Sequence, residues 1–152
     1  MEFEEQEDLQ PEKPPIAIYS KWAVLGFSIF FSTVVGSILL MLNLRAIGNK
    51  RAGYIVLLFG IAYKVITGIL LGLIIPPPKV SATMQEILSN PKLIYYSLAV
   101  DLLGAAILTE YFFKKYIPAN NGYERKGIGI PLLVIFALSF LVGFILQSIA
   151  IK

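Results

Sequence analysis

Four long apolar runs dominate this chain and leave little else from which to build a fold. They cover residues 22–44, 52–78, 93–113 and 127–151. A helix needs roughly 20 apolar residues to cross the hydrocarbon core of a bilayer, and each run meets that length. The runs are continuous rather than alternating, which favours helices over the strands of a membrane barrel. The sequence therefore predicts four transmembrane helices.

The composition agrees with a membrane protein. Hydrophobic residues make up 57% of the chain and charged residues 15%, whereas soluble domains average about 25% charged residues. The segments between the runs are too short to bury a core of their own. We therefore expect an all-α integral membrane protein with a disordered acidic tail over residues 1–18 and one transmembrane domain over residues 19–152. Its four helices are expected at 22–44, 53–75, 93–115 and 129–151.

The connecting segments predict two antiparallel hairpins. A short basic turn over residues 45–51 follows the first run, and the proline triplet 76–78 ends the second because proline lacks an amide donor. Thr83 is followed three residues later by Glu86, which is a capping-box pattern. We expect a short interfacial helix over residues 80–90, between the second and third transmembrane helices.

Orientation and internal symmetry stay open at this level. In a four-span topology, seven lysines and arginines follow the first and third helices and five lie on the opposite side. This excess favours both termini outside the cytoplasm, although helix pairs with both ends in the cytoplasm are the commoner arrangement. Residues 57–71 also match residues 132–146 at several positions, and Tyr19-Ser20 precedes Asn43 by the same interval at which Tyr96-Ser97 precedes Asn120. The match has two explanations, an internal duplication and the chance similarity of apolar sequences.

Lys64 and Asp101 are the charged residues that lie deepest within the apolar runs. Such groups are costly in a bilayer unless they are paired or hydrated. Lys64 lies four residues from Gly60 and Gly68, and Asp101 lies four residues from Ala105. Residues four apart share a helix face, and small residues let helices approach closely. We expect both charged residues to face the bundle interior, at depths that differ by roughly 3 Å, and to form an ion pair.

Two roles are open for this pair. It is either a structural clip that sets the register of two helices, or part of a site for a substrate, an ion or a proton. If it is a clip, replacing Lys64 by Met and Asp101 by Leu together should leave folding intact. Either single replacement should destabilise the protein, because it leaves one charge buried without a partner.

Three further polar residues lie in or beside the runs. Tyr63 adjoins Lys64 and Gln147 lies in the last run, so we place both with Lys64 and Asp101 in one candidate intramembrane polar site. Glu110 lies four residues before Lys114, near the end of its run. That spacing favours a local ion pair on one helix face.

The residues needed for most enzyme chemistry are missing from the sequence. It contains no cysteine and no histidine, which removes thiolate catalysis and the commonest acid–base and metal ligands. It also has no phosphate-binding loop and no metalloprotease or serine-hydrolase motif. We therefore expect no enzyme activity, no cofactor, no metal and no nucleic-acid partner.

The sequence is typical of a small multipass protein of a bacterial inner membrane. We expect a non-enzymatic role, of an accessory, immunity or assembly kind, that acts through helix–helix contacts. Its expected partners are the lipid bilayer and either further copies of the chain or another membrane protein. The alternative is a small oligomeric transporter or channel whose pathway is lined by Lys64 and Asp101.

Overall fold

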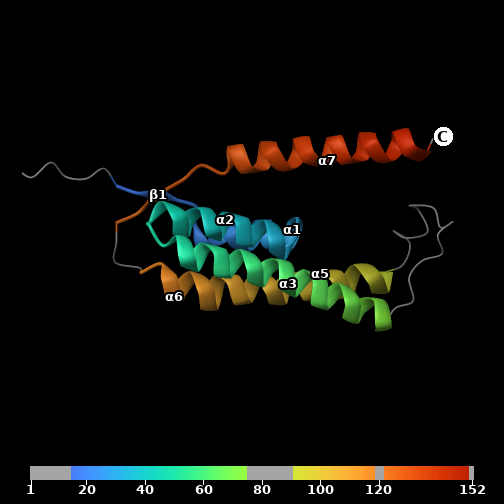
Figure 1. The fold of residues 1–152 in the computed structure, drawn as a ribbon, viewed down its shortest axis with the longest axis horizontal. Coiled ribbons are helices and arrows are strands. Elements are labelled where there is room, and N and C mark those ends of the chain that lie inside the picture. The colour runs from blue at the N-terminus through green and yellow to red at the C-terminus, as the bar shows by residue number, and fades with distance from the viewer. Residues whose placement is uncertain (1–14, 75–90, 119–121, 151–152) are drawn as a thin grey trace, which may run out of the picture.

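The computed structural model describes residues 15–74, 91–118 and 122–150 and confirms a mostly helical chain (Figure 1). The tail over residues 1–14 and the predicted interfacial helix lie outside the described residues. The helices are α1 (Lys21–Phe30), α2 (Thr33–Ala46), α3 (Lys50–Ile74), α5 (Pro91–Ala106), the π-helix η1 (Ile107–Phe113), α6 (Lys114–Tyr116) and α7 (Gly129–Ala150). Two short strands, β1 (Ala17–Ile18) and β2 (Glu124–Arg125), complete the described elements.

Two stretches of the described residues are long and apolar enough to cross a membrane. They are Lys50–Ile74, which is α3, and Ile94–Tyr116, which runs through α5, η1 and α6. At 1.5 Å per residue the 25 residues of α3 span about 37 Å. The predicted number of four such helices is not confirmed, because the first predicted helix is divided.

The helix expected at 22–44 is two helices, α1 and α2, so this prediction is wrong. The backbone leaves the helical conformation at Ser32, which has φ 173° and ψ 161°, and the Ser32 hydroxyl then accepts a hydrogen bond from the Val35 amide. The chain reverses direction at this point, so that α1 and α2 form an antiparallel hairpin (Figure 1). With 10 and 14 residues, the two helices are about 15 Å and about 21 Å long.

Asn43 closes the base of this hairpin. Its side-chain oxygen accepts a hydrogen bond from the Tyr19 amide at 2.7 Å, and its side-chain nitrogen donates to the Tyr19 carbonyl at 2.8 Å. Asn43 is 1% exposed, and both polar ends of its amide are satisfied by the backbone 24 residues earlier. This contact holds the segment before α1 against the last turn of α2.

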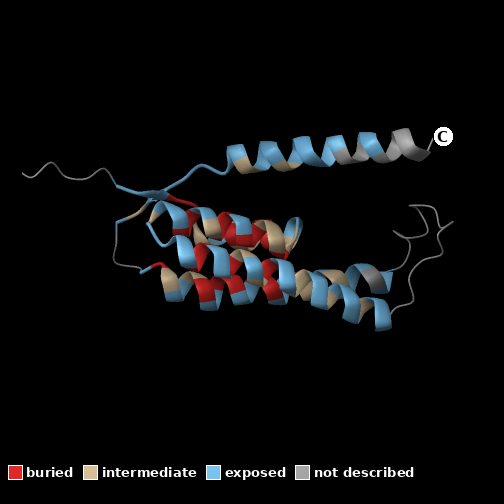
Figure 2. Ribbon diagram, viewed as in Figure 1, coloured by how far each residue is buried: buried red, intermediate tan, exposed pale blue. Residues whose placement is uncertain are grey.

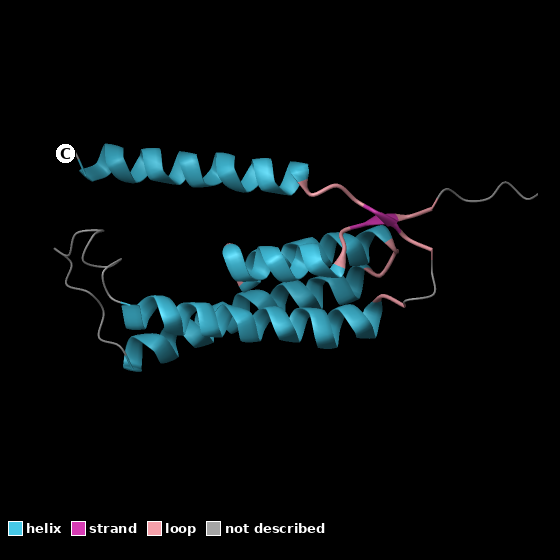
Figure 3. Ribbon diagram, turned by 180° about the vertical axis from the view of Figure 1, so that it is seen from behind, coloured by secondary structure: helices cyan, strands magenta, loops and turns pink. Residues whose placement is uncertain are grey.

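Strand β1 lies at residues 17–18, within the segment 1–18 that was predicted to be a disordered tail. Ala17 and Ile18 of β1 pair in parallel with Glu124 and Arg125 of β2. The pairing places the start of α7 beside the hairpin base, and Figure 3 shows the strands at one end of the molecule. We call the end that contains β1, β2, the α2–α3 turn and α6 the strand end. The opposite end, where α3 stops and α5 begins, is the far end.

Gly48 and Asn49 determine the geometry of the α2–α3 turn. Gly48 has φ +88°, a left-handed conformation that glycine adopts without steric cost. The Asn49 side chain then accepts a hydrogen bond from the Ala52 amide at 3.1 Å and so caps the start of α3. This short turn makes α2 and α3 antiparallel neighbours.

Among the described residues, the buried core fills the half of the molecule nearest the strand end (Figure 2). The hairpin is shorter than α3 and reaches about halfway along it, so that the far half of α3 has no such cover. In α3 the buried residues are Ala52, Gly53, Val56 and Gly60. Further core residues are Ile18, Tyr19, Val24, Phe27, Leu39, Leu40, Leu44, Leu108, Phe112 and Ile117.

Close helix contacts in the core depend on glycines that face hydroxyl side chains. A Cβ atom on Gly36 would overlap the Ser28 side chain across the hairpin, and one on Gly60 would overlap Ser37. In the continuous helix expected at 22–44, Ser28 and Gly36 would lie eight residues apart on one face. They instead lie on two antiparallel helices and pack against each other.

The structure does not show two similar halves, as an internal duplication would predict. In the first half of the proposed repeat the opening segment is divided at Ser32. In the second half the corresponding stretch, Ile94–Tyr116, is helical throughout. The two halves therefore differ in architecture within the described residues.

Leucine at Gly36 should destabilise the protein, whereas leucine at Gly26 should not. Gly36 has no room for a side chain, and overpacking of this kind costs roughly 1–3 kcal/mol. Gly26 lies in the same hairpin with open space around its Cβ position. Reversible unfolding of Gly36→Leu and Gly26→Leu in detergent measures the difference. Equal stability of the two variants would contradict the hairpin packing.

Candidate functional site

The tip of the α1–α2 hairpin meets Lys64 and Asp101 near the middle of the two long helical stretches. Lys64 lies in α3 and Asp101 in α5. The Lys64 ammonium is 3.0 Å from each oxygen of the Asp101 carboxylate. The ion pair, which we expected because Lys64 and Asp101 each lie four residues from a small residue, is therefore confirmed.

Thr33 adds two further donors to the same carboxylate. Its hydroxyl donates to Asp101 Oδ1 at 3.2 Å, and its backbone N–H donates to the same oxygen at 3.4 Å. Thr33 is the first residue of α2, and the first N–H groups of a helix have no partner within that helix. The positive end of the α2 dipole also favours a carboxylate at this place. Asp101 thus supplies the acceptor that the start of α2 requires.

The two charged residues differ in exposure. Asp101 is 7% exposed as a residue, and its side chain is 10% exposed. The side chain of Lys64 is 40% exposed. Lys64 lies where the hairpin ends, so its ammonium reaches the carboxylate from the uncovered half of α3. The carboxylate is enclosed by protein, whereas the lysine stays accessible.

Tyr63 belongs to the same neighbourhood but bonds elsewhere. Its hydroxyl donates to the Val100 carbonyl at 2.7 Å, which ties α3 to α5 one residue before Asp101. A Cβ atom on Gly104 would overlap both Thr33 and the Tyr63 ring. Gly104 therefore permits the hairpin tip, α3 and α5 to meet closely around the carboxylate.

The other polar residues considered from the sequence lie apart from this cluster. Gln147 is in α7, at a position whose side chain is outside the described part of the structure. Glu110 pairs with Lys114 as expected, and it also pairs with Lys21 of α1. This second ion-pair group lies at the strand end and fastens α1 to η1.

Thr33 is the residue of the site that sequence reasoning missed. The available signal was local: Ser32 is a preferred helix N-cap residue, and it precedes the β-branched run Thr33–Val34–Val35. That signal is weak inside an apolar run, because serine and threonine also occur within transmembrane helices. The acceptor that makes the break tolerable lies 68 residues away in the sequence.

The polar groups of this cluster form hydrogen bonds with one another. The chain's own donors occupy Asp101 Oδ1 three times and Oδ2 once. Within the described residues there is no group of carboxylates suited to a metal ion, and no buried side-chain polar atom lacks a partner. The arrangement can fix three helices against one another, and it has one accessible ammonium.

Comparisons with known protein families, with curated proteins and with solved structures found no match to this chain.

The double replacement Lys64→Met with Asp101→Asn should preserve stability better than Lys64→Met with Asp101→Leu. Asparagine keeps an oxygen that accepts from Thr33, whereas leucine leaves the Thr33 N–H and hydroxyl without an acceptor, at a cost of about 1–3 kcal/mol. The structure thereby modifies the expectation that the Met/Leu pair folds like the original. Free energies of unfolding in detergent compare the two variants.

The single variant Asp101→Leu serves as the reference for that comparison. It leaves the Lys64 charge without its partner in addition to the two Thr33 donors, whose loss of an acceptor alone costs about 1–3 kcal/mol. It should therefore be the least stable of the three. If asparagine and leucine at position 101 were equivalent in the Lys64→Met background, the Thr33 contact would contribute nothing to stability.

Proposed function

We propose that the chain is an integral membrane protein with three spans and one re-entrant hairpin. Three observations support this topology. α3 and Ile94–Tyr116 have the length and composition of spans, and α7 is a 22-residue helix that runs from the strand end to the far end (Figure 1). The α1–α2 hairpin enters and leaves at the strand end and stops near the middle of α3.

A re-entrant hairpin is physically acceptable here because its tip is enclosed by protein. Backbone that is not helical survives at membrane depth only where its polar groups are satisfied away from lipid. At this tip Asp101 accepts from the Thr33 N–H, and the Ser32 hydroxyl accepts from the Val35 N–H. The cost of interrupting the helix is thereby reduced.

The distribution of positive charge supports one orientation in this topology. Among the described residues Lys92 is the lysine of the far end. The strand end carries Lys21, Arg45, Lys50, Arg51, Lys114, Lys115, Arg125 and Lys126. Because cytoplasmic loops carry the excess of lysine and arginine, the strand end faces the cytoplasm. The segment before α1 then lies inside and the end of α7 outside, which replaces the expectation that both termini lie outside.

Single cysteines at Ile16, Lys50 and Lys92 should separate the two topologies. The sequence has no native cysteine, so each variant carries one thiol. With a re-entrant hairpin, Ile16→Cys and Lys50→Cys react with an impermeant maleimide from the same side, and Lys92→Cys reacts from the other. A continuous helix over 22–44 would put positions 16 and 50 on opposite sides, and that result would exclude the proposed topology.

The role we propose is non-enzymatic: the protein acts through helix–helix contacts as an accessory or assembly component. The observation that carries this proposal is that donors of the chain itself bind both oxygens of Asp101. A substrate that replaced Lys64 or Thr33 at this carboxylate would break contacts that hold three helices together. We therefore interpret the Lys64–Asp101 pair as a structural clip.

Helix association has an available surface on the far half of α3. Gly68 and Gly72 lie four residues apart, and the space around the Cβ position of each is open. Both are exposed. Small residues at this spacing let a second helix approach closely, and such approach is a main source of affinity between helices in lipid.

Leucine at Gly68 and Gly72 together should abolish association and leave the fold unchanged. Neither substitution meets another atom of the chain at Cβ, so monomer stability should be retained. Native purification in mild detergent, followed by cross-linking, detects self-association or a bound partner. Gly26→Leu is the matched control, because it adds the same side chain at another open glycine. If association survives the double substitution, the surface around Gly68 and Gly72 is not where the second helix binds.

Transport is the second candidate function, and the exposed ammonium of Lys64 favours it. Discontinuous helices whose half-helix N-termini lie near the membrane midplane are also a feature of membrane transporters. The variant Lys64→Met with Asp101→Asn tests this role, since it is expected to fold. If reconstituted wild-type protein conducts protons or monovalent ions and this variant does not, the pair belongs to a pathway. Equal flux, or none from either protein, supports the clip.

A further inference from the structure

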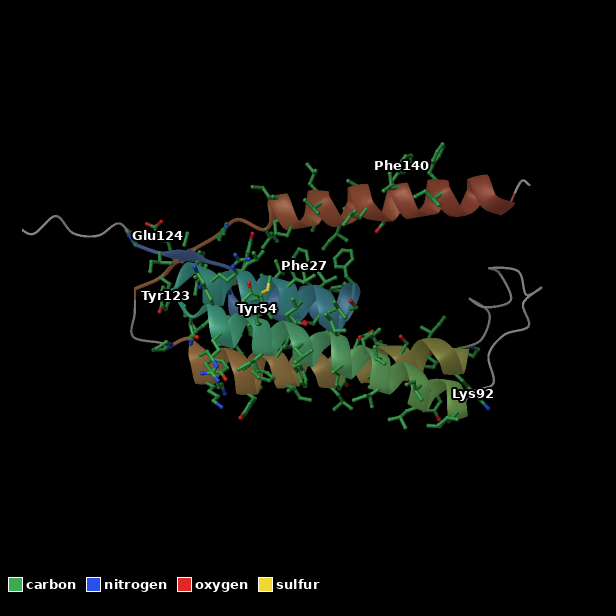
Figure 4. All side chains as sticks on the ribbon, viewed as in Figure 1. Phe27, Tyr54, Lys92, Tyr123, Glu124 and Phe140 are labelled. Carbon is green, nitrogen blue, oxygen red and sulfur yellow. The ribbon has the colours of Figure 1, made fainter. Side chains whose placement is uncertain are left out.

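Two pockets lie next to each other on α1, and Trp22 lines both of them. One, which we call the polar pocket because charged side chains form part of its lining, lies at the strand end, between the start of α1, the end of α6 and β2. The other is apolar and lies between α1 and the first half of α7. In Figure 4 Tyr123 and Glu124 lie at the strand end, and Phe27 lies on the side of α1 that faces α7. The two pockets therefore adjoin at Trp22, with the charged lining residues on one side of it and the apolar pocket on the other.

The polar pocket carries an excess of positive charge. It has a volume of about 440 Å³, and its charged lining residues are Lys21, Lys114, Arg125 and Glu124. Lys21 and Lys114 share the single carboxylate of Glu110. Arg125 makes no ion pair within the described residues. After Glu110 and Glu124 are counted, one positive charge is left over, and the lining also offers the Ser20 hydroxyl.

The apolar pocket has the size of a ligand site and almost no polar lining. Its volume is about 500 Å³, within the range of about 300–1,000 Å³ that is common for small-molecule sites. Trp22, Phe27 and Phe30 of α1 line it together with Leu132 and Phe136 of α7. Gly26 forms part of its wall and leaves open space where a side chain would stand.

We propose that the two pockets together bind one anionic phospholipid. The phosphate lies at the strand end near Lys114 and Arg125, and an acyl chain follows α1 between Phe27 and Phe136. This inference rests on the proposed membrane insertion, which puts the strand end at headgroup level. A phospholipid is the ligand that joins an anionic group to a long apolar chain in this order, and cations near a membrane surface attract anionic lipids.

Trp22 allows a direct test, because it is the single tryptophan of the chain. The protein is reconstituted in phosphatidylcholine vesicles with a small mole fraction of phosphatidylglycerol that carries brominated acyl chains. A bound anionic lipid should quench Trp22 fluorescence several-fold more than its mole fraction in the bilayer predicts. Brominated phosphatidylcholine at the same mole fraction is the reference and should quench only in proportion to its abundance.

Two variants locate the effect in the two pockets. Arg125→Gln should lower the preference for phosphatidylglycerol about five-fold, the effect of one cation near an anionic surface. Its matched control is Lys50→Gln, which removes a cation at the same end but outside the polar pocket. Gly26→Leu should fill the apolar pocket and reduce the excess quenching, whereas Ala99→Leu, at an exposed position of α5 away from both pockets, should leave it unchanged.

The outcomes of these measurements distinguish failure of the lipid site from failure of the membrane insertion on which the site rests. If neither brominated lipid quenches Trp22, the hairpin is not in the bilayer and the proposed topology fails. If both lipids quench in proportion to their abundance, the hairpin is inserted but the anionic lipid site is excluded. Equal loss of preference in Arg125→Gln and Lys50→Gln would show a general surface potential instead of a site, and would likewise exclude it.

Discussion

The contact between the Asp101 carboxylate and the start of α2 is the interaction on which the rest of this structure depends. An apolar run that stops being helical halfway exposes N–H groups that lipid or a hydrophobic core cannot satisfy. Asp101 accepts from the N–H and the hydroxyl of Thr33. The carboxylate in turn needs a positive partner, which Lys64 supplies at 3.0 Å. One acidic residue thus makes the chain reversal at Ser32 tolerable and joins α2, α3 and α5.

The hairpin divides the molecule into two unlike halves. Near the strand end, α1 and α2 fill the space beside α3 and α5, and small residues such as Gly36 and Gly60 allow close packing. Toward the far end these helices have no such cover, and Gly68 and Gly72 have open space around them. The proposed functions follow this division. The closed half holds the clip and carries the lipid pockets on its outer side, and the open half offers the surface for another helix.

Part of the candidate site was predictable from spacing alone. Lys64 and Asp101 each lie four residues from a small residue, and this periodicity was enough to infer that they meet. Thr33 was not predictable in the same way, because its role depends on a partner 68 residues away. The roles of Asn43 and Tyr19 were hidden for the same reason. Their hydrogen bonds join two ends of a hairpin whose existence no local pattern in the first run required.

The sequence by itself determined that the chain is mostly helical, where three of its long helices lie, and that Lys64 and Asp101 pair. These properties follow from apolar length and from residues that recur on one helix face, which are local quantities. Only the tertiary structure decided that residues 22–44 turn back on themselves. The physical reason is that the local apolar pattern of residues 22–44 is compatible with a broken helix as well as with a continuous one. They differ in backbone groups left without partners, and the acceptor that satisfies them is brought into place only when α5 packs against the hairpin.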